Sequence, residues 1–222
     1  MTKIALFAGG DLSYYETNFD YFIGIDRGSL FLLKNGLPLD MAVGDFDSVS
    51  NQELAQIKAS CPKVIQAKPE KDDTDTELAL KVIFQEHPDA QVTIFGAFGG
   101  RIDHMMSNVF LPSDPDLAPS MRQIALRDTL NLIHYYPAGR QTILPQKGMT
   151  YVSFMPESDA PLTIFGARYE LSAVNFFQKK IYSSNEFLDQ PIEVELDSGY
   201  LIVIYSKDRS WHDLSITYHR GC

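Results

Sequence analysis

Two carboxylates stand two positions apart in the stretch Gly44-Asp45-Phe46-Asp47-Ser48. In an extended segment, residues i and i+2 point to the same face, with their Cα atoms roughly 6.6 Å apart. At that spacing two acids can share one hard cation, and they repel each other unless a positive charge lies between them. The stretch therefore indicates either a Mg²⁺ site that carries a phosphate or a polar turn that caps a helix.

The helix after this stretch has a cap of its own. Ser50 and Glu53 form a capping box in front of a segment with helical character that extends to about Ser60. Asp45 and Asp47 are therefore surplus to that helix, which favours the metal interpretation.

A second acidic segment runs from Glu70 to Asp75 as Glu-Lys-Asp-Asp-Thr-Asp. Thr74 and Glu77 form another capping box, which predicts that Asp72 precedes a helix and that Asp75 lies in its first turn. Asp72 and Asp75 could then face one ligand, with Lys71 adding a cation. A solvated helix start would give the same pattern.

A glycine-rich turn, Gly96 to His104, links a predicted strand over 91–95 to a predicted helix over 105–111. Such a turn presents backbone N–H groups to an anion, although this one fits neither the Walker loop nor the Gly-x-Gly-x-x-Gly pattern. The guanidinium of Arg101 could bind a phosphate, and the carboxylate of Asp103 could bind a metal. His104 and Asn108, four positions apart, would lie on the same face of the helix. The candidate residues are Gly99, Gly100, Arg101, Asp103, His104 and Asn108.

The elements that must position these residues alternate between strand and helix. Strands are predicted over 3–8, 21–25, 41–43, 63–67, 91–95, 123–126 and 130–136. The first ends at Gly9, and the second ends at Asp26-Arg27-Gly28, directly before a predicted helix over 28–35. Loops that follow parallel strands gather at one edge of a sheet. The pattern predicts an α/β domain in which the acids share a Mg²⁺ site for transfer of a phosphoryl or pyrophosphoryl group from a nucleotide.

The composition changes after Gly139, where short strands are predicted to follow one another over 150–155, 162–165, 173–177, 192–196 and 200–205. This predicts a small all-β sandwich after the mostly parallel α/β domain. We place the boundary within 137–140, which gives domains 1–137 and 138–222.

Composition excludes some partners. The 222 residues carry 19 basic and 29 acidic side chains, a net charge of −10, so nucleic acid is not an expected partner. The chain has neither an apolar stretch long enough for a membrane span nor a signal segment at Met1, and its two cysteines make no disulfide framework. We expect a cytoplasmic protein.

The three motifs together resemble the thiamine pyrophosphokinase family, which shows Gly-Asp-Phe-Asp-Ser, Glu-Lys-Asp-x-Thr-Asp and Gly-Gly-Arg-x-Asp-His followed by Asn. All three occur here in that order, at Gly44 to Ser48, Glu70 to Asp75, and Gly99 to His104 with Asn108. The resemblance implies transfer of pyrophosphate from ATP to the hydroxyethyl oxygen of thiamine, which gives thiamine diphosphate and AMP.

The resemblance also implies roles for individual residues. Mg²⁺ is held among Asp45, Asp47, Asp72, Asp75 and Asp103, and Asp72 or Asp103 receives the hydroxyl proton. Lys71 and Arg101 contact phosphates. The remaining nucleotide contacts fall on Gly9, Asp26, Arg27, Gly28, Gly99, Gly100, His104 and Asn108. In that family two subunits build each site, which implies a homodimer, with Ser184 and Asn185 as candidates for the aminopyrimidine end of thiamine.

Two other classes stay open at this point. An Asp-x-Asp after a strand also occurs in phosphatases and in nucleotide-sugar enzymes, although the haloacid dehalogenase type places its nucleophilic Asp on the first strand and Asp45 follows the third. A sensor without activity could bind a nucleotide in one domain and a vitamin-like ligand in the other.

Overall fold

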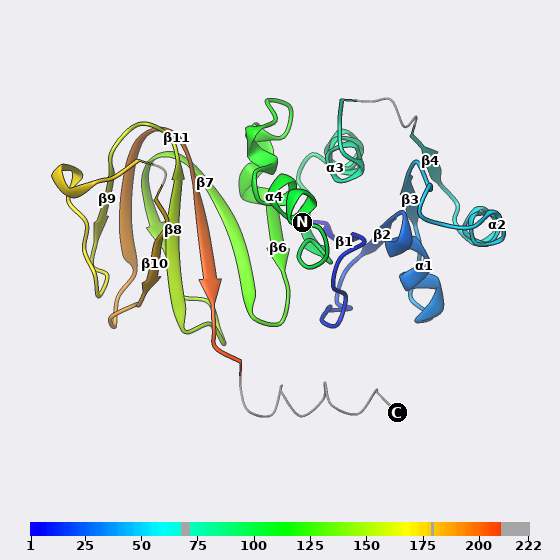
Figure 1. Ribbon diagram of the computed structural model, residues 1–222, viewed down its shortest axis with the longest axis horizontal. Helices are drawn as coiled ribbons and strands as arrows, with labels where there is room; N and C mark the ends of the chain where they lie inside the picture. Colours follow the sequence, from blue (N-terminus) through cyan, green and yellow to red (C-terminus); the bar gives the residue numbers. More distant parts are fainter. Residues whose placement is uncertain (68–71, 179, 210–222) are drawn as a thin grey trace. The chain divides into compact units, whose positions relative to one another are not determined.

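The computed structural model describes residues 1–67, 72–178 and 180–209. It divides into two units, Met1–Thr129 and Leu130–Cys222, which are described separately (Figure 1).

In the first unit, the described strands form a parallel sheet in the order β4-β3-β2-β1-β5-β6. Their bounds are Lys3–Phe7 for β1, Tyr21–Ile25 for β2, Met41–Gly44 for β3, Val64–Gln66 for β4, Gln91–Phe95 for β5 and Ile124–Arg127 for β6. The central strands are apolar along nearly their whole length because both faces of a parallel sheet are covered. The expected mostly parallel α/β domain is confirmed.

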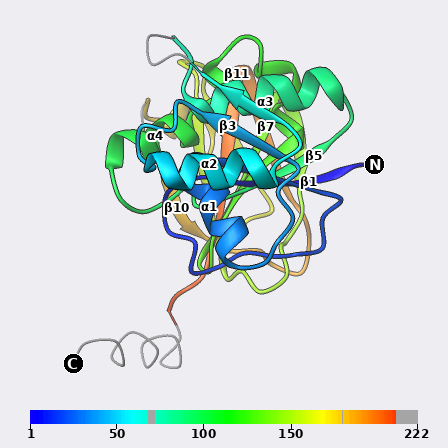
Figure 2. The same ribbon diagram turned by 90° about the vertical axis from the view of Figure 1, so that its right-hand side faces the viewer.

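Helices cover the two faces of this sheet. Their bounds are Arg27–Lys34 for α1, Asn51–Ser60 for α2, Asp75–Glu86 for α3 and Ile102–Val109 for α4. The chain moves outward from β2 to β4 through α1 and α2, and then it returns through α3 to β5 on the other side of β1. Because parallel crossovers are right-handed, this reversal places α3 opposite α1, as Figures 1 and 2 show. Buried rings of Phe7, Phe22 and Phe95 fill the space beneath α1.

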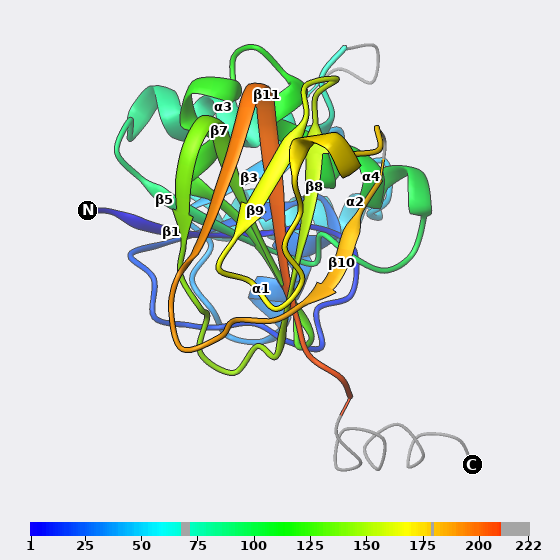
Figure 3. The ribbon, with the colours of Figure 1, turned by 90° about the vertical axis from the view of Figure 1, so that its left-hand side faces the viewer.

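The second unit is β-rich, as expected. Its strands are β7 Asn131–Ile143, β8 Tyr151–Glu157, β9 Leu162–Phe165, β10 Tyr182–Asn185 and β11 Ile192–Ser206. The long strand β11 pairs with β7 on one side, while β9 and β8 pair in turn with its two halves on the other side (Figure 3). An irregularity between Leu196 and Tyr200 separates these halves, which were predicted as two strands.

The division between the units differs from the predicted one. The boundary predicted within 137–140 falls inside β7, which pairs with β11 from Asn131 to Ile143 without a break in its own course. The structure therefore divides after Thr129 and assigns the whole of β7 to the second unit.

Two element predictions were wrong. The strand predicted over 173–177 is the short 3-10 helix η3, Ala173–Asn175, where Val174 is 91% exposed and has no buried face to join. The helix predicted from Met105 begins earlier, at Ile102, so Asp103 and His104 lie in its first turn. Among the described helices, none is long and apolar enough to cross a membrane.

Candidate active site

Three carboxylates meet where the strands β2 and β3 and the helix α3 present their ends. Asp26 directly follows β2, Asp45 directly follows β3, and Asp75 is the first residue of α3. One oxygen from each lies within 4.8 Å of the others. The carboxyl edge of a parallel sheet therefore gathers acids that are far apart in the sequence, as the loop pattern predicts.

The electrostatics of this cluster centre on Asp26. Burial raises its pKa, and the negative charges of Asp75 and Asp45 raise it further, to about 7. The backbone N–H of Phe46 donates to Asp26 Oδ1 at 3.0 Å and acts in the opposite direction. The pKa is high first because the carboxyl group is buried and second because two other acids face it.

The backbone conformation at the ends of β2 and β3 allows the three carboxylates to come close together. Gly44 ends β3, and a Cβ at this position would lie 1.9 Å from Asp26 Oδ1. Asp26 and Phe46 both adopt positive φ, at 44° and 59°, which is uncommon for residues other than glycine. The turn after β3 is closed by the N–H of Asp47, which donates to Asp45 Oδ1 at 3.0 Å. Strained backbone on both sides of the cluster is typical of a functional site.

The donor set fits Mg²⁺. This ion takes hard oxygen ligands at 2.0–2.1 Å, so opposite ligands lie roughly 4.2 Å apart. Adjacent ligands of the same octahedron lie roughly 2.9 Å apart, so the oxygens of Asp26, Asp45 and Asp75, which lie within 4.8 Å of one another, would move closer together to bind one ion. Mg²⁺ typically keeps one or two carboxylates and leaves its other positions to phosphates and water, so an edge of three acids is sufficient.

Other acids predicted as metal ligands lie outside this group. Within the described residues, the carboxylate cluster does not include Asp47, Asp72 or Asp103. Asp47 and Asp72 are exposed, and Lys71, predicted to contact phosphate, lies outside the described residues. Asp26, in contrast, was assigned to the nucleotide. Its place directly after β2, beside β3, was the signal that could have placed it in this cluster of acids.

The glycine-rich turn packs against the loop after β1. The N–H of Gly10 donates to Gly96 O at 2.9 Å, and the N–H of Asp11 donates to Phe98 O at 2.7 Å. Gly9, Gly99 and Gly100 are left exposed beside this pairing. The two loops therefore form one surface at the carboxyl edge of β1 and β5.

Arg101 and Asp103 contact each other at the start of α4. Two hydrogen bonds join the guanidinium to the carboxylate, at 3.1 and 2.6 Å. The ion pair lowers the pKa of Asp103 to about 2, and the backbone N–H of His104 contributes to the same effect. All three side chains are exposed. Arg101 can therefore bind an anion only if its guanidinium leaves Asp103.

Two residues predicted to bind the nucleotide have structural contacts. Asn108 is buried, and its Nδ2 donates to Ala97 O at 3.0 Å, which ties α4 to the glycine-rich turn. Gly28 packs against β1, where a Cβ would lie 1.9 Å from Phe7 O. Arg27, the first residue of α1, is exposed.

In the second unit, the two candidates for thiamine contact differ in exposure. Asn185 is buried, accepts from the N–H groups of Tyr169 and Glu186, and donates to Tyr169 O at 2.8 Å. Ser184 is exposed, with φ at 58°. Asn185 therefore fixes the local chain, and Ser184 is the one whose side chain faces solvent.

An open α/β sheet with acids at the ends of its strands, followed by a β-rich unit, is an arrangement that suits a two-domain enzyme acting on a metal-bound phosphate substrate. Two family models match the chain. Residues 12–118 match the catalytic domain of thiamin pyrophosphokinase, and residues 140–201 match its vitamin B1 binding domain.

Individual relatives agree with these models. The chain is 33% identical to the thiamine pyrophosphokinase of Bacillus subtilis, over 94% of this chain and all of that protein. A thiamin pyrophosphokinase family protein from Enterococcus faecalis is 40% identical, with a TM-score of 0.87 over 94% of this chain and 100% of that one. Yeast thiamin pyrophosphokinase, at 12% identity and a TM-score of 0.73 over 93% of this chain and 86% of that one, shows the shared fold. The chain belongs to the thiamine pyrophosphokinase family.

Proposed function

We propose that this protein transfers the pyrophosphate of ATP to the hydroxyethyl oxygen of thiamine, which gives thiamine diphosphate and AMP. Membership of the family supports the activity, and the cluster of Asp26, Asp45 and Asp75 is the observation that carries the site. Mg²⁺ bound there would neutralise the phosphates and orient them for attack.

The residues around the cluster act mainly by position and charge. The turn of Asp45 and the first turn of α3 hold carboxylates at one edge, where a metal-bound triphosphate can dock. The exposed residues Gly99 and Gly100 could offer backbone N–H groups to phosphate oxygens, and the guanidinium of Arg101 could do so after leaving Asp103. Asp72 and Asp103 are both exposed at this edge and are the candidates to receive the hydroxyl proton.

We also propose that the protein is a cytoplasmic homodimer in which two subunits build each site, with Ser184 and Asn185 on the thiamine side. The family resemblance supports this arrangement, and the acidic, cysteine-poor composition supports the compartment.

Product analysis tests the activity. Purified protein incubated with Mg-ATP and thiamine is expected to yield AMP and thiamine diphosphate in equal amounts, measured by liquid chromatography. A yield of ADP with thiamine monophosphate would contradict pyrophosphate transfer. Removal of Mg²⁺ by a chelator is expected to abolish formation of both products.

A further inference from the structure

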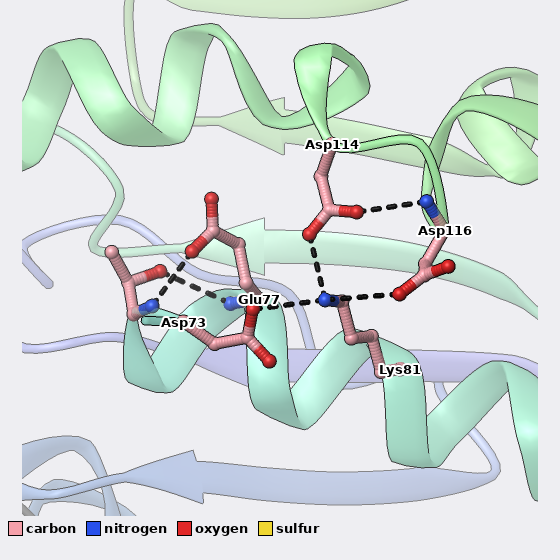
Figure 4. A network of polar contacts seen from close by, with 6 residues as sticks. Asp73, Glu77, Lys81, Asp114 and Asp116 are labelled. Atoms are coloured by element: carbon pink, nitrogen blue, oxygen red, sulfur yellow. Dashed lines mark hydrogen bonds and ion pairs between the residues drawn. The ribbon is translucent and has the colours of Figure 1, made fainter. Parts of the chain in front are cut away.

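Lys81, on α3, lies among three carboxylates that come from two distant segments. Its Nζ is 2.9 Å from Asp73, 2.8 Å from Asp114 and 3.2 Å from Asp116 (Figure 4). Asp73 belongs to the loop immediately before α3, while Asp114 and Asp116 belong to the connector after α4. The side chain of Lys81 therefore joins the loop before α3, which leads to Asp75, to the connector after α4.

The connector side of this network is a fixed anchor. The side chain of Asp114 is only 13% exposed, and that of Lys81 is 24% exposed. Asp114 Oδ1 also accepts from the N–H of Asp116 at 2.8 Å, and its backbone oxygen accepts from Leu117 and Ala118. Exposed ion pairs contribute little, but a partly buried network with a fixed member constrains the groups that it holds.

The loop side of the network is adjacent to the proposed metal site. Asp73 is followed by Thr74, the cap of α3, and by Asp75, one of the three clustered acids. Five acids line the hollow around Lys81: Asp72, Asp73, Glu77, Asp114 and Asp116. Without the cation these acids would repel one another.

We propose that Lys81 is a positioning residue for pyrophosphate transfer: it holds Asp73 against Asp114 and so fixes the start of α3 where Asp75 meets Asp26 and Asp45. This inference rests on the proposed function, because it assigns Lys81 to the Mg-ATP half of the same site. In this role Lys81 acts through Asp73 and the start of α3, not by direct contact with substrate or metal.

The test compares Lys81→Met with Lys34→Met, which removes an equal charge from an exposed ion pair with Glu53 between α1 and α2. For Lys81→Met, the KM for Mg-ATP and the Mg²⁺ concentration for half-maximal rate are expected to rise roughly tenfold, with the KM for thiamine unchanged. Lys81→Arg, which keeps the cation, is expected to restore most of the wild-type values. Lys34→Met is expected to match the wild type.

Two outcomes would overturn the proposal. One is that Lys81→Met changes only the melting temperature and leaves the Mg²⁺ and Mg-ATP parameters equal to those of Lys34→Met. The other is that the KM values for thiamine and Mg-ATP rise together. If Lys81→Met does not fold, Asp114→Asn weakens the same anchor and is expected to shift the Mg-ATP parameters alone.

The proposed function and this inference can fail separately. If wild-type protein forms no AMP with thiamine, the function is wrong, and Mg-ATP affinity measured by calorimetry still tests Lys81. If the wild type is active and the affinities of Lys81→Met and Lys34→Met for Mg-ATP are equal, only the role of Lys81 is wrong.

Discussion

The ionised form of Asp26 lowers the stability of the folded protein when no Mg²⁺ is added. Burial, together with the charges of Asp75 and Asp45, raises its pKa to about 7 from an ordinary value of 3.8. A carboxylic acid with a raised folded pKa binds more protons in the folded than in the unfolded state between these two values. Its contribution to the free energy of unfolding therefore falls as the pH rises through that window and is lowest above pH 7.

The first prediction concerns this pH dependence. Without Mg²⁺, Asp26→Asn is expected to be more stable relative to the wild type at pH 8 than at pH 5, because the amide does not ionise. Urea unfolding at both values measures the difference. A stability difference that is the same at pH 5 and pH 8 would show that Asp26 is not the titrating group. Added Mg²⁺ is expected to stabilise the wild type more than the variant.

The second prediction concerns Asp45 and Asp75. Replacement of either by Asn is expected to lower kcat by roughly 100-fold or more, because in the proposed site each supplies a charged ligand to the Mg²⁺ that acts on the phosphates. Steady-state rates measured alongside circular dichroism test this. Asp89→Asn, at an exposed position in the turn before β5, is the control and should keep the wild-type rate. Normal turnover by a folded Asp45→Asn protein would remove Asp45 from the site.

At the scale of elements, the residues that cap helices α2 and α3 differ from the acids of the candidate site. Ser50 accepts from the N–H of Glu53, whose side chain returns to Ser50, and Thr74 and Glu77 form the same reciprocal pair. Both boxes were predicted, and both are confirmed. With the helix ends satisfied in this way, Asp45 and Asp75 have no capping task that would explain them.

The third prediction uses the end of β3. Gly44→Ala places a methyl group 1.9 Å from the present position of Asp26 Oδ1, so the carboxylate must turn away from Asp45 and Asp75. Because φ at Gly44 is 151°, where any other residue is strained, we expect stability to fall, and because Asp26 is displaced we expect the activity per folded molecule to fall as well.

The matched control is Ser50→Ala, which is expected to cost about 1 kcal/mol of stability while leaving kcat unchanged. Thermal melts and steady-state rates of both variants provide the comparison. The argument for Gly44 fails if its alanine variant retains full activity.

At the scale of the whole molecule, the proposed homodimer makes the fourth prediction. A subunit with Asp75→Asn and a subunit with Ser184→Arg, co-expressed with different tags and purified through both, should form a dimer with one intact site. That mixed dimer is expected to show half of the wild-type rate, while each variant alone is inactive. An inactive mixed dimer, or a wild-type protein that sediments as a monomer, would contradict shared sites.

The sequence alone determined the order of elements in the first unit, both capping boxes and the family, because these depend on local spacing and on short motifs. It did not determine the division at Thr129, since the break in composition lies inside β7, and only pairing with β11 defines that strand. It also missed the network of Lys81, because no local pattern connects this residue to Asp114, which lies 33 positions further along the chain.

The acids first noted, Asp45 and Asp47, show the same limit. Their spacing indicated a shared cation, but the fold separates them: Asp45 joins Asp26 and Asp75, and Asp47 is exposed in the turn. The expectation assumed an extended segment, in which both side chains point to the same face, and here Phe46 between them adopts φ of 59°. Which acids meet was decided by the parallel sheet, which brings the ends of β2, β3 and the start of α3 to one edge.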